Sequence, residues 1–144
     1  MTDLPSESRD RFRHFQSIAS RWMDNDIYGH VNNVVYYAYF DTVINEYLIR
    51  KGGLDIHNSP VVGVCAESQC RYRQGFAFPE AILAGLRVGH LGRRSVRYEI
   101  GIFKEGAEGA IAEGRFVHVF VDRRTMQPVA IPADLRRALE AITV

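Results

Sequence analysis

The sequence is poor in cysteine and carries almost no excess charge of either sign. Its 144 residues include two cysteines, Cys65 and Cys70, too few for a disulfide framework or a zinc knuckle. They stand five apart in an expected strand and should point to opposite faces, so we expect no disulfide between them. Eighteen Lys and Arg against seventeen Asp and Glu give a net charge of +1, which argues against nucleic-acid binding through phosphates.

Long apolar runs are also missing. None approaches the roughly 20 residues that cross a bilayer, and residues 1–13 hold no apolar centre of a signal peptide. We therefore expect a reduced, cytoplasmic protein without a membrane span. The length fits one domain, residues 1–144, with residues 1–11 as a flexible lead. A content of 47% hydrophobic and 24% charged residues excludes a disordered chain.

One long helix is predicted over residues 34–50. Asn32 or Asn33 suits its N-cap, and Gly52-Gly53 provides its end. The polar side chains occupy an arc of roughly 140° when residues are spaced about 100° apart; they belong to Asp41, Thr42, Asn45 and Glu46. A helix that is apolar over more than half its girth must be enveloped by other elements.

The remaining pattern predicts strands. They are expected over residues 12–22, 61–72, 81–91, 95–103 and 110–122. Glycine-bearing turns at 89–94 and 104–109 make the last three an antiparallel meander. A short amphipathic helix is expected over residues 132–142, with Pro132 in its first turn. The predicted fold class is α+β: an antiparallel sheet of about five strands wrapped around one long central helix.

The segment before the long helix carries the chemistry. Residues 21–33 read Arg-Trp-Met-Asp-Asn-Asp-Ile-Tyr-Gly-His-Val-Asn-Asn and place two carboxylates, Asp24 and Asp26, near the helix N-terminus. Unpaired N–H groups there can hold a developing oxyanion, and a carboxylate opposite them can attack a carbonyl or activate water. The alternative is that these residues only form turns and caps, a role that suits Asp24 better than Asp26.

This segment resembles the signature of the 4-hydroxybenzoyl-CoA thioesterase family of hotdog-fold acyl-CoA hydrolases, in the form Arg-Trp-x-Asp-x-Asp-x-x-Gly-His-Val-Asn-Asn. Further matches extend the resemblance over about residues 15–139; they include Glu67, Tyr72, Gly92, Ser95 and residues 117–122. The resemblance implies a hotdog fold and hydrolysis of an acyl-CoA thioester. It implies no metal and no cofactor beyond the coenzyme A of the substrate.

The resemblance also suggests roles for single residues. Asp26 is similar to the family's catalytic nucleophile or general base, and Asn33 matches the residue whose backbone N–H polarises the carbonyl. Part of the family has Tyr at that position. Gly29 would let the loop backbone approach the thioester, and His30 is either an acid/base or a structural residue. Glu67 is another candidate acid, or it pairs with a neighbour such as Arg71.

Substrate and assembly follow from the same resemblance. Arg93, Arg94 and Ser95 form a basic hairpin tip that could bind the phosphates of coenzyme A, since guanidinium groups bind phosphate bidentately. An acyl carrier protein could present the thioester instead. Phe76 and Phe78 are candidates for an acyl pocket. The family implies a homodimer or homotetramer with each active site between two subunits.

Two other functions stay open at the sequence level. Asp26 and His30 stand four apart, and hotdog hydratases or dehydratases use an Asp-His pair, although their motifs usually carry Asn-Pro before the His. A non-catalytic acyl-CoA-binding module is the third possibility, against which the presence of Asp26 argues.

Overall fold

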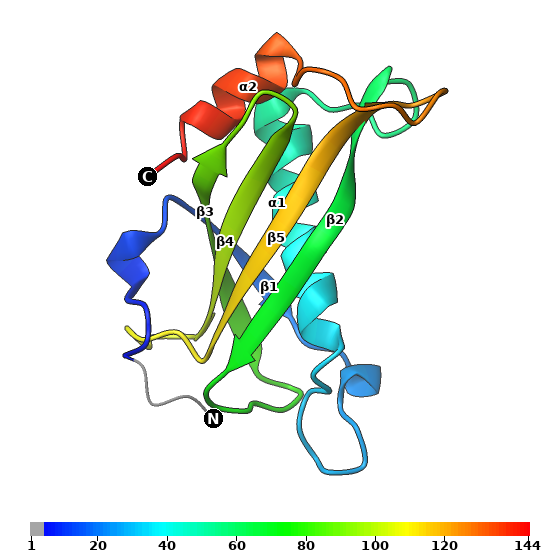
Figure 1. Ribbon diagram of the computed structural model, residues 1–144. Coiled ribbons are helices and arrows are strands. Elements are labelled where there is room, and N and C mark those ends of the chain that lie inside the picture. Colours follow the sequence, from blue (N-terminus) through cyan, green and yellow to red (C-terminus); the bar gives the residue numbers. More distant parts are fainter. Residues whose placement is uncertain (1–4) are drawn as a thin grey trace.

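Five antiparallel strands form the sheet of the protein. The computed structural model describes residues 5–144 and places the strands in the order β1-β3-β4-β5-β2 (Figure 1). The strands are β1 (His14–Ala19), β2 (Val61–Tyr72), β3 (Ala81–Leu91), β4 (Ser95–Lys104) and β5 (Ala112–Asp122). Strands β3, β4 and β5 are neighbours in the sheet, so the predicted meander is confirmed.

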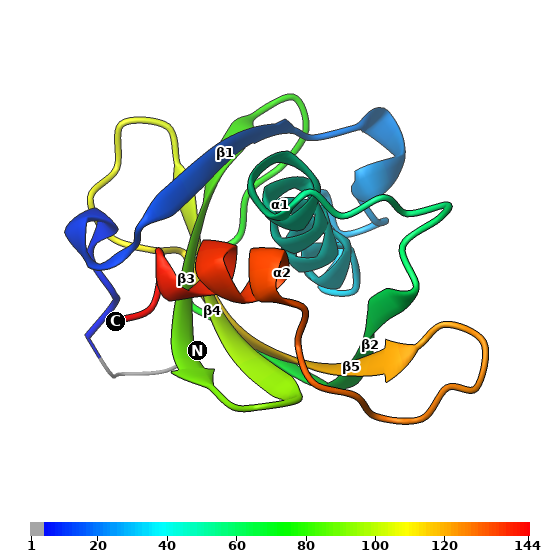
Figure 2. The ribbon, with the colours of Figure 1, turned by 90° about the horizontal axis from the view of Figure 1, so that it is seen from above.

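The long helix α1 (Val35–Gly52) lies in the hollow of the curved sheet, with β1 on one side and β2 on the other (Figure 2). Its buried face includes Phe40, Val43 and Ile44, none of which is exposed to solvent. Among the described residues, no helix has both the length and the apolarity to cross a membrane. This sheet wrapped around one helix is the hotdog fold, as predicted.

The C-terminal end of α1 follows from local chemistry. Gly53 adopts a φ of +70°, and the N–H of Leu54 donates to the Leu48 carbonyl at 3.1 Å, which closes the last turn. A Cβ on Gly52 would lie 2.6 Å from the Leu135 side chain of α2 (Ala133–Glu140), so a larger residue there would displace that side chain. The predicted stop at Gly52-Gly53 is therefore confirmed.

A β-bulge in β2 overturns one prediction about the cysteines. Cys65 lies opposite His118 on β5 and Cys70 lies opposite Gly114, with a register shift after Cys65. His118 and Gly114 are four residues apart on one strand, so both cysteines point to the same face of the sheet. The expectation of opposite faces was wrong because a bulge adds one residue to the alternation. Both thiols are free.

Residues 5–11 of the expected flexible lead contact the sheet in the structure. From Pro5 onward it lies on the outer face of the sheet, and Arg9–Arg11 form a 3-10 turn. The Glu7 carboxylate lies 3.1 Å from the Arg87 guanidinium, and the N–H of Arg9 donates to the Glu108 carbonyl at 3.0 Å. These contacts connect residues 5–11 to the sheet, and the flexibility of the lead stays a prediction; residues 1–4 lie outside the described part.

The buried His118 should make stability depend on pH. Burial lowers the pKa of His118 from 6.5 to about 4, and its Nδ1 pairs with the Tyr98 hydroxyl at 3.0 Å. Because the unfolded chain binds the proton more readily, the stabilisation is complete above pH 6.5 and is lost as the pH falls toward 4. We expect this residue alone to lower the free energy of unfolding by about 3 kcal/mol over that range, measured by urea unfolding. In His118→Leu the free energy of unfolding should depend less steeply on pH between 6.5 and 4. An unchanged pH dependence would contradict the assignment of this effect to His118.

Candidate functional site

The loop before α1 is a closed turn held by its own backbone. The N–H of Asp26 donates to the His30 carbonyl at 3.0 Å, and the N–H of Gly29 donates back to the Asp26 carbonyl at 3.1 Å. Gly29 has a φ of +86°, a conformation that glycine adopts at little cost. A bridge between Asn25 and Val31 closes the base of the turn. The loop therefore presents the Asp26 side chain from a defined backbone.

Asp24 anchors this loop in the interior. Its carboxylate is 1% exposed and accepts hydrogen bonds from the Arg21 backbone and guanidinium and from the Tyr39 hydroxyl, at 2.8, 2.9 and 3.0 Å. Burial alone would raise the pKa of Asp24, but these hydrogen bonds and the Arg21 charge outweigh it and lower the pKa. Asp24 is thus ionised and fully engaged, which agrees with the capping role that the sequence favoured for it.

Asp26 is half-buried and is held by two donors. Its Oδ1 accepts from the Tyr28 N–H at 2.9 Å, and its Oδ2 accepts from the Asn32 side-chain amide at 3.1 Å. The Asn32 Oδ1 in turn accepts from the Val34 N–H at 3.0 Å. Asn32 therefore connects the carboxylate to the start of α1, a link that the sequence does not indicate, because an Asn before a helix is expected only as a cap.

The N–H of Asn33 stays available at this helix end. The N–H groups of Val35 and Tyr36 donate to the carbonyls of Asn32 and Asn33, whereas that of Asn33 has no acceptor among residues 5–144. The Tyr72 hydroxyl donates to the Asn33 carbonyl at 2.8 Å and helps fix this residue. An unpaired N–H at the positive end of a helix attracts a developing negative charge.

The two other candidate acids, His30 and Glu67, do not have their side chains in contact with Asp26. His30 is exposed, and its ring packs against Gly75, where an added Cβ would lie 3.1 Å from the ring. Its contact with Asp26 is through its backbone carbonyl, which accepts from the Asp26 N–H. Glu67 lies opposite Val117, on the outer face of the sheet, and has no ion pair with Arg71 among the described residues. Glu67 is therefore separated from the loop by the sheet.

The predicted coenzyme A tip lies far from Asp26 within one chain. Arg93, Arg94 and Ser95 belong to the β3–β4 hairpin beside α2, at the opposite end of the sheet from the loop (Figure 1). Both arginines are exposed. Their backbone carbonyls accept from Ile131 and Phe120, which fixes the hairpin but leaves the guanidinium groups free to bind. The structure does not bring this tip and Asp26 together in a single chain.

Aromatic and apolar side chains surround the loop. Phe76 is 1% exposed and packs edge-on against Tyr36, so it belongs to the core. Phe78 is half-buried against Trp22. Several large apolar side chains of the loop and helix start are strongly exposed, with exposed fractions of 66–94%; they are Trp22, Met23, Ile27, Tyr28 and Val34. Exposed apolar clusters of this kind mark binding surfaces.

A five-stranded antiparallel sheet wrapped around one long helix, with the Asp26 carboxylate on the loop that leads into that helix, defines a hotdog-fold protein. The model of the thioesterase-like superfamily matches residues 20–139. The chain therefore belongs to that superfamily.

Individual relatives agree with this assignment. The crystal structure of the PA5185 protein from Pseudomonas aeruginosa is 56% identical, with a TM-score of 0.95 over 96% of this chain and 97% of that one. The uncharacterized protein YsmA of Bacillus subtilis is 32% identical over 54% of each chain, so this chain spans about half the length of that curated relative. The DHNA-CoA thioesterase of Staphylococcus aureus is 20% identical, with a TM-score of 0.78 over 88% of this chain and 87% of its own, and shares the fold.

Proposed function

We propose that this protein is an acyl-CoA thioesterase, which hydrolyses the thioester to the free acid and coenzyme A. The observation that carries the proposal is the Asp26 carboxylate, which Asn32 connects to a helix start where the Asn33 N–H has no acceptor within the described part of the chain. Membership in the thioesterase-like superfamily supports it. An acyl carrier protein thioester is the alternative form of the substrate.

The groups at the site can perform this hydrolysis in two ways. In both, the Asn33 N–H stabilises the negative charge on the carbonyl oxygen. As a nucleophile, Asp26 attacks the carbonyl carbon, the C–S bond breaks with loss of the thiolate, and water then cleaves the mixed anhydride. As a general base, Asp26 takes a proton from water, the water oxygen attacks, and the proton passes to the departing thiolate.

The active form in this proposal is a homodimer or homotetramer. Strand β2 is a sheet edge of 12 residues with no further strand beside it in the described chain, and long free edges pair readily with other chains. The exposed apolar side chains around the loop, such as Ile27 and Tyr28, would be covered by a neighbouring subunit. Arg93 and Arg94 would then serve the site of another subunit, because they lie far from their own Asp26.

Thiol release tests the proposal directly. The protein is mixed with a panel of acyl-CoAs of different chain length and aromaticity, with an acyl carrier protein thioester as a separate arm, and free thiol is followed with a thiol-reactive dye. Turnover of at least one thioester is expected. A crotonyl-CoA arm follows loss of the conjugated double bond, and hydration there without thiol release would contradict the proposal in favour of a hydratase. Binding without either reaction would indicate a non-catalytic module.

Asn32→Ala should lower the rate without unfolding the protein. The change removes the amide that donates to Asp26 and the oxygen that accepts from Val34. We expect kcat to fall roughly tenfold, because each charge-assisted hydrogen bond contributes about 1.5–3 kcal/mol and only part of that is felt in the transition state. Asn32→Asp is the matched comparison, since it keeps the acceptor but sets a like charge beside Asp26. A kcat equal to the wild type in both variants would show that Asn32 does not position the carboxylate.

A further inference from the structure

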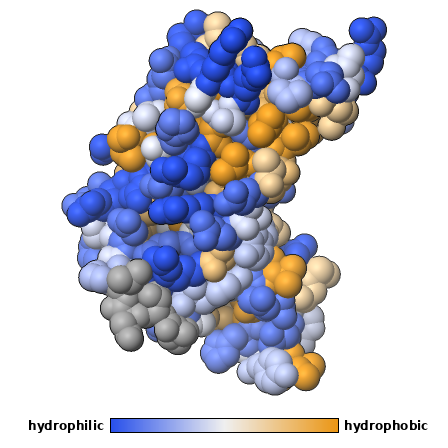
Figure 3. Space-filling model, in the orientation of Figure 1, coloured by the Kyte–Doolittle hydropathy of each residue, from blue (hydrophilic) through white to orange (hydrophobic). Residues whose placement is uncertain are grey.

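A separate cavity of about 170 Å³ lies on the outer face of the sheet, beneath the N-terminal lead. Six charged side chains line it: Glu7, Arg71, Arg87, Glu99, Glu113 and Arg115. Figure 3 shows hydrophilic side chains over the middle of this face of the molecule. None of Asp26, Asn32 and Asn33 lines the cavity, which is therefore separate from the candidate active site.

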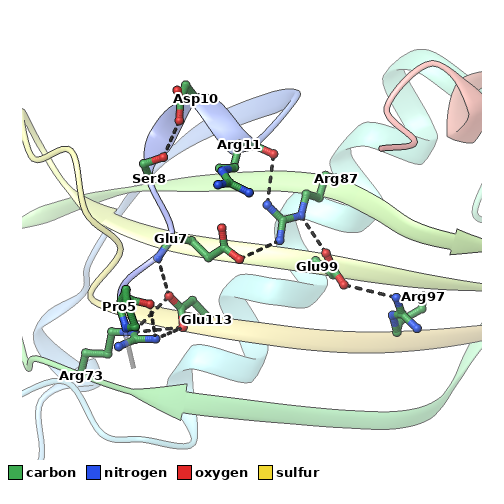
Figure 4. Close-up of polar contacts among 10 residues, drawn as sticks. All are labelled: Pro5, Glu7, Ser8, Asp10, Arg11, Arg73, Arg87, Arg97, Glu99 and Glu113. Carbon is green, nitrogen blue, oxygen red and sulfur yellow. Dashed lines mark hydrogen bonds and ion pairs between the residues drawn. The ribbon is translucent and has the colours of Figure 1, made fainter. Parts of the chain in front are cut away.

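The three carboxylates of the cavity are already paired with arginines. Arg87 bridges Glu7 and Glu99, with nitrogen–oxygen distances of 3.1 and 2.7 Å. Glu113 accepts from Arg73 at 2.8 Å and also from the backbone N–H of Glu7, also at 2.8 Å (Figure 4). Glu99 also lies 3.4 Å from the Arg97 guanidinium, so three arginines (Arg73, Arg87 and Arg97) balance the three glutamates and form a neutral frame that holds the lead against the sheet.

Two arginines of the same cavity have no such partner. The side chains of Arg71 and Arg115 make no hydrogen bond or ion pair with any residue between 5 and 144, and both residues are exposed. Arg71 lies opposite Glu113 in the β2–β5 ladder, so Arg115 on β5 is its diagonal neighbour, roughly 7–8 Å away between Cα atoms. Because Arg73, Arg87 and Arg97 already balance the three glutamates, the charge left over at the cavity is positive and belongs to the guanidinium groups of Arg71 and Arg115.

We propose that this cavity binds a small anion with at least two anionic oxygens, of the phosphate or dicarboxylate class, between Arg71 and Arg115. A guanidinium group presents a planar pair of donors that matches such oxygens bidentately. The volume is below the roughly 300–1,000 Å³ of pockets for drug-sized ligands, which favours a compact anion.

Isothermal titration calorimetry tests this site with inorganic phosphate and with succinate as two arms, and with acetate as a single-carboxylate comparison. The wild type should bind phosphate or succinate at least tenfold more tightly than acetate. Arg71→Gln and Arg115→Gln should each weaken binding roughly tenfold, and the double variant should abolish it. Arg124→Gln, which removes one exposed positive charge outside the cavity, should bind like the wild type.

Several results would overturn the proposal of an anion site. Equal affinity in the wild type and the double variant would do so, as would the absence of binding by the wild type at millimolar anion. A change in the light-scattering mass of the double variant would show that the two arginines pair with a second copy of the chain instead. Thiol release does not enter this test, so the site and the proposed function can fail independently.

Discussion

Replacing Asp26 by Asn is expected to lower kcat for thioester hydrolysis about a thousandfold while the protein stays folded. The amide keeps the shape of the carboxylate, and its oxygen can still accept from the Tyr28 N–H. However, it is a poor nucleophile and cannot take a proton from water, so both routes of the proposed mechanism are lost. The half-buried position predicts a change in the free energy of unfolding within about 1 kcal/mol. Thiol release and urea unfolding measure the two effects.

Asp41→Asn is the matched control for that experiment. Asp41 is an exposed carboxylate on α1 whose side chain accepts from Asn45, four residues later, and from no other residue of the described range 5–144. The same loss of charge there should leave kcat unchanged. If Asp26→Asn keeps the wild-type rate, the catalytic assignment of Asp26 fails even though the chain remains a hotdog protein.

The part of the site that could be predicted is the part that is local in sequence. Asp26 and Asn33 stand seven residues apart, so the motif alone predicts that both lie in the loop before the long helix, and their catalytic roles stay a prediction. The helix itself was predictable because its polar positions fall on one arc and glycines follow its end. The same holds for the meander, since consecutive strands joined by short turns pair with each other.

What could not be predicted depends on contacts between distant segments. The bulge after Cys65 reverses the alternation of β2, and nothing in the composition of that strand signals an extra residue. The contact of the lead with the sheet depends on the ion pair between Glu7 and Arg87, 80 residues away, which a local pattern cannot show. The distance between Arg93 and Asp26 likewise follows from strand order and not from spacing along the chain.

Asp24→Ala is expected to lower the free energy of unfolding by about 3 kcal/mol at pH 7, measured by urea unfolding. The carboxylate is buried and accepts from three donors, two on Arg21 and one on Tyr39. Its removal leaves the hydroxyl of Tyr39 without a partner in a site that is 5% exposed. Tyr39→Phe, which removes the hydroxyl together with its need for a partner, should cost only about 1 kcal/mol.

The pH dependence of the same variant separates the charge of Asp24 from its packing. The pKa of Asp24 is lower in the folded state than the roughly 3.9 of an unfolded chain, so the unfolded state takes up the proton first. The stabilisation is therefore complete above about pH 4 and is lost as the pH falls through the lowered pKa. Asp24→Asn should be less stable than the wild type at pH 7, and the difference should shrink as the pH is lowered to about 3. A difference that stays constant over that range would mean that shape, and not charge, is what Asp24 contributes to holding the loop.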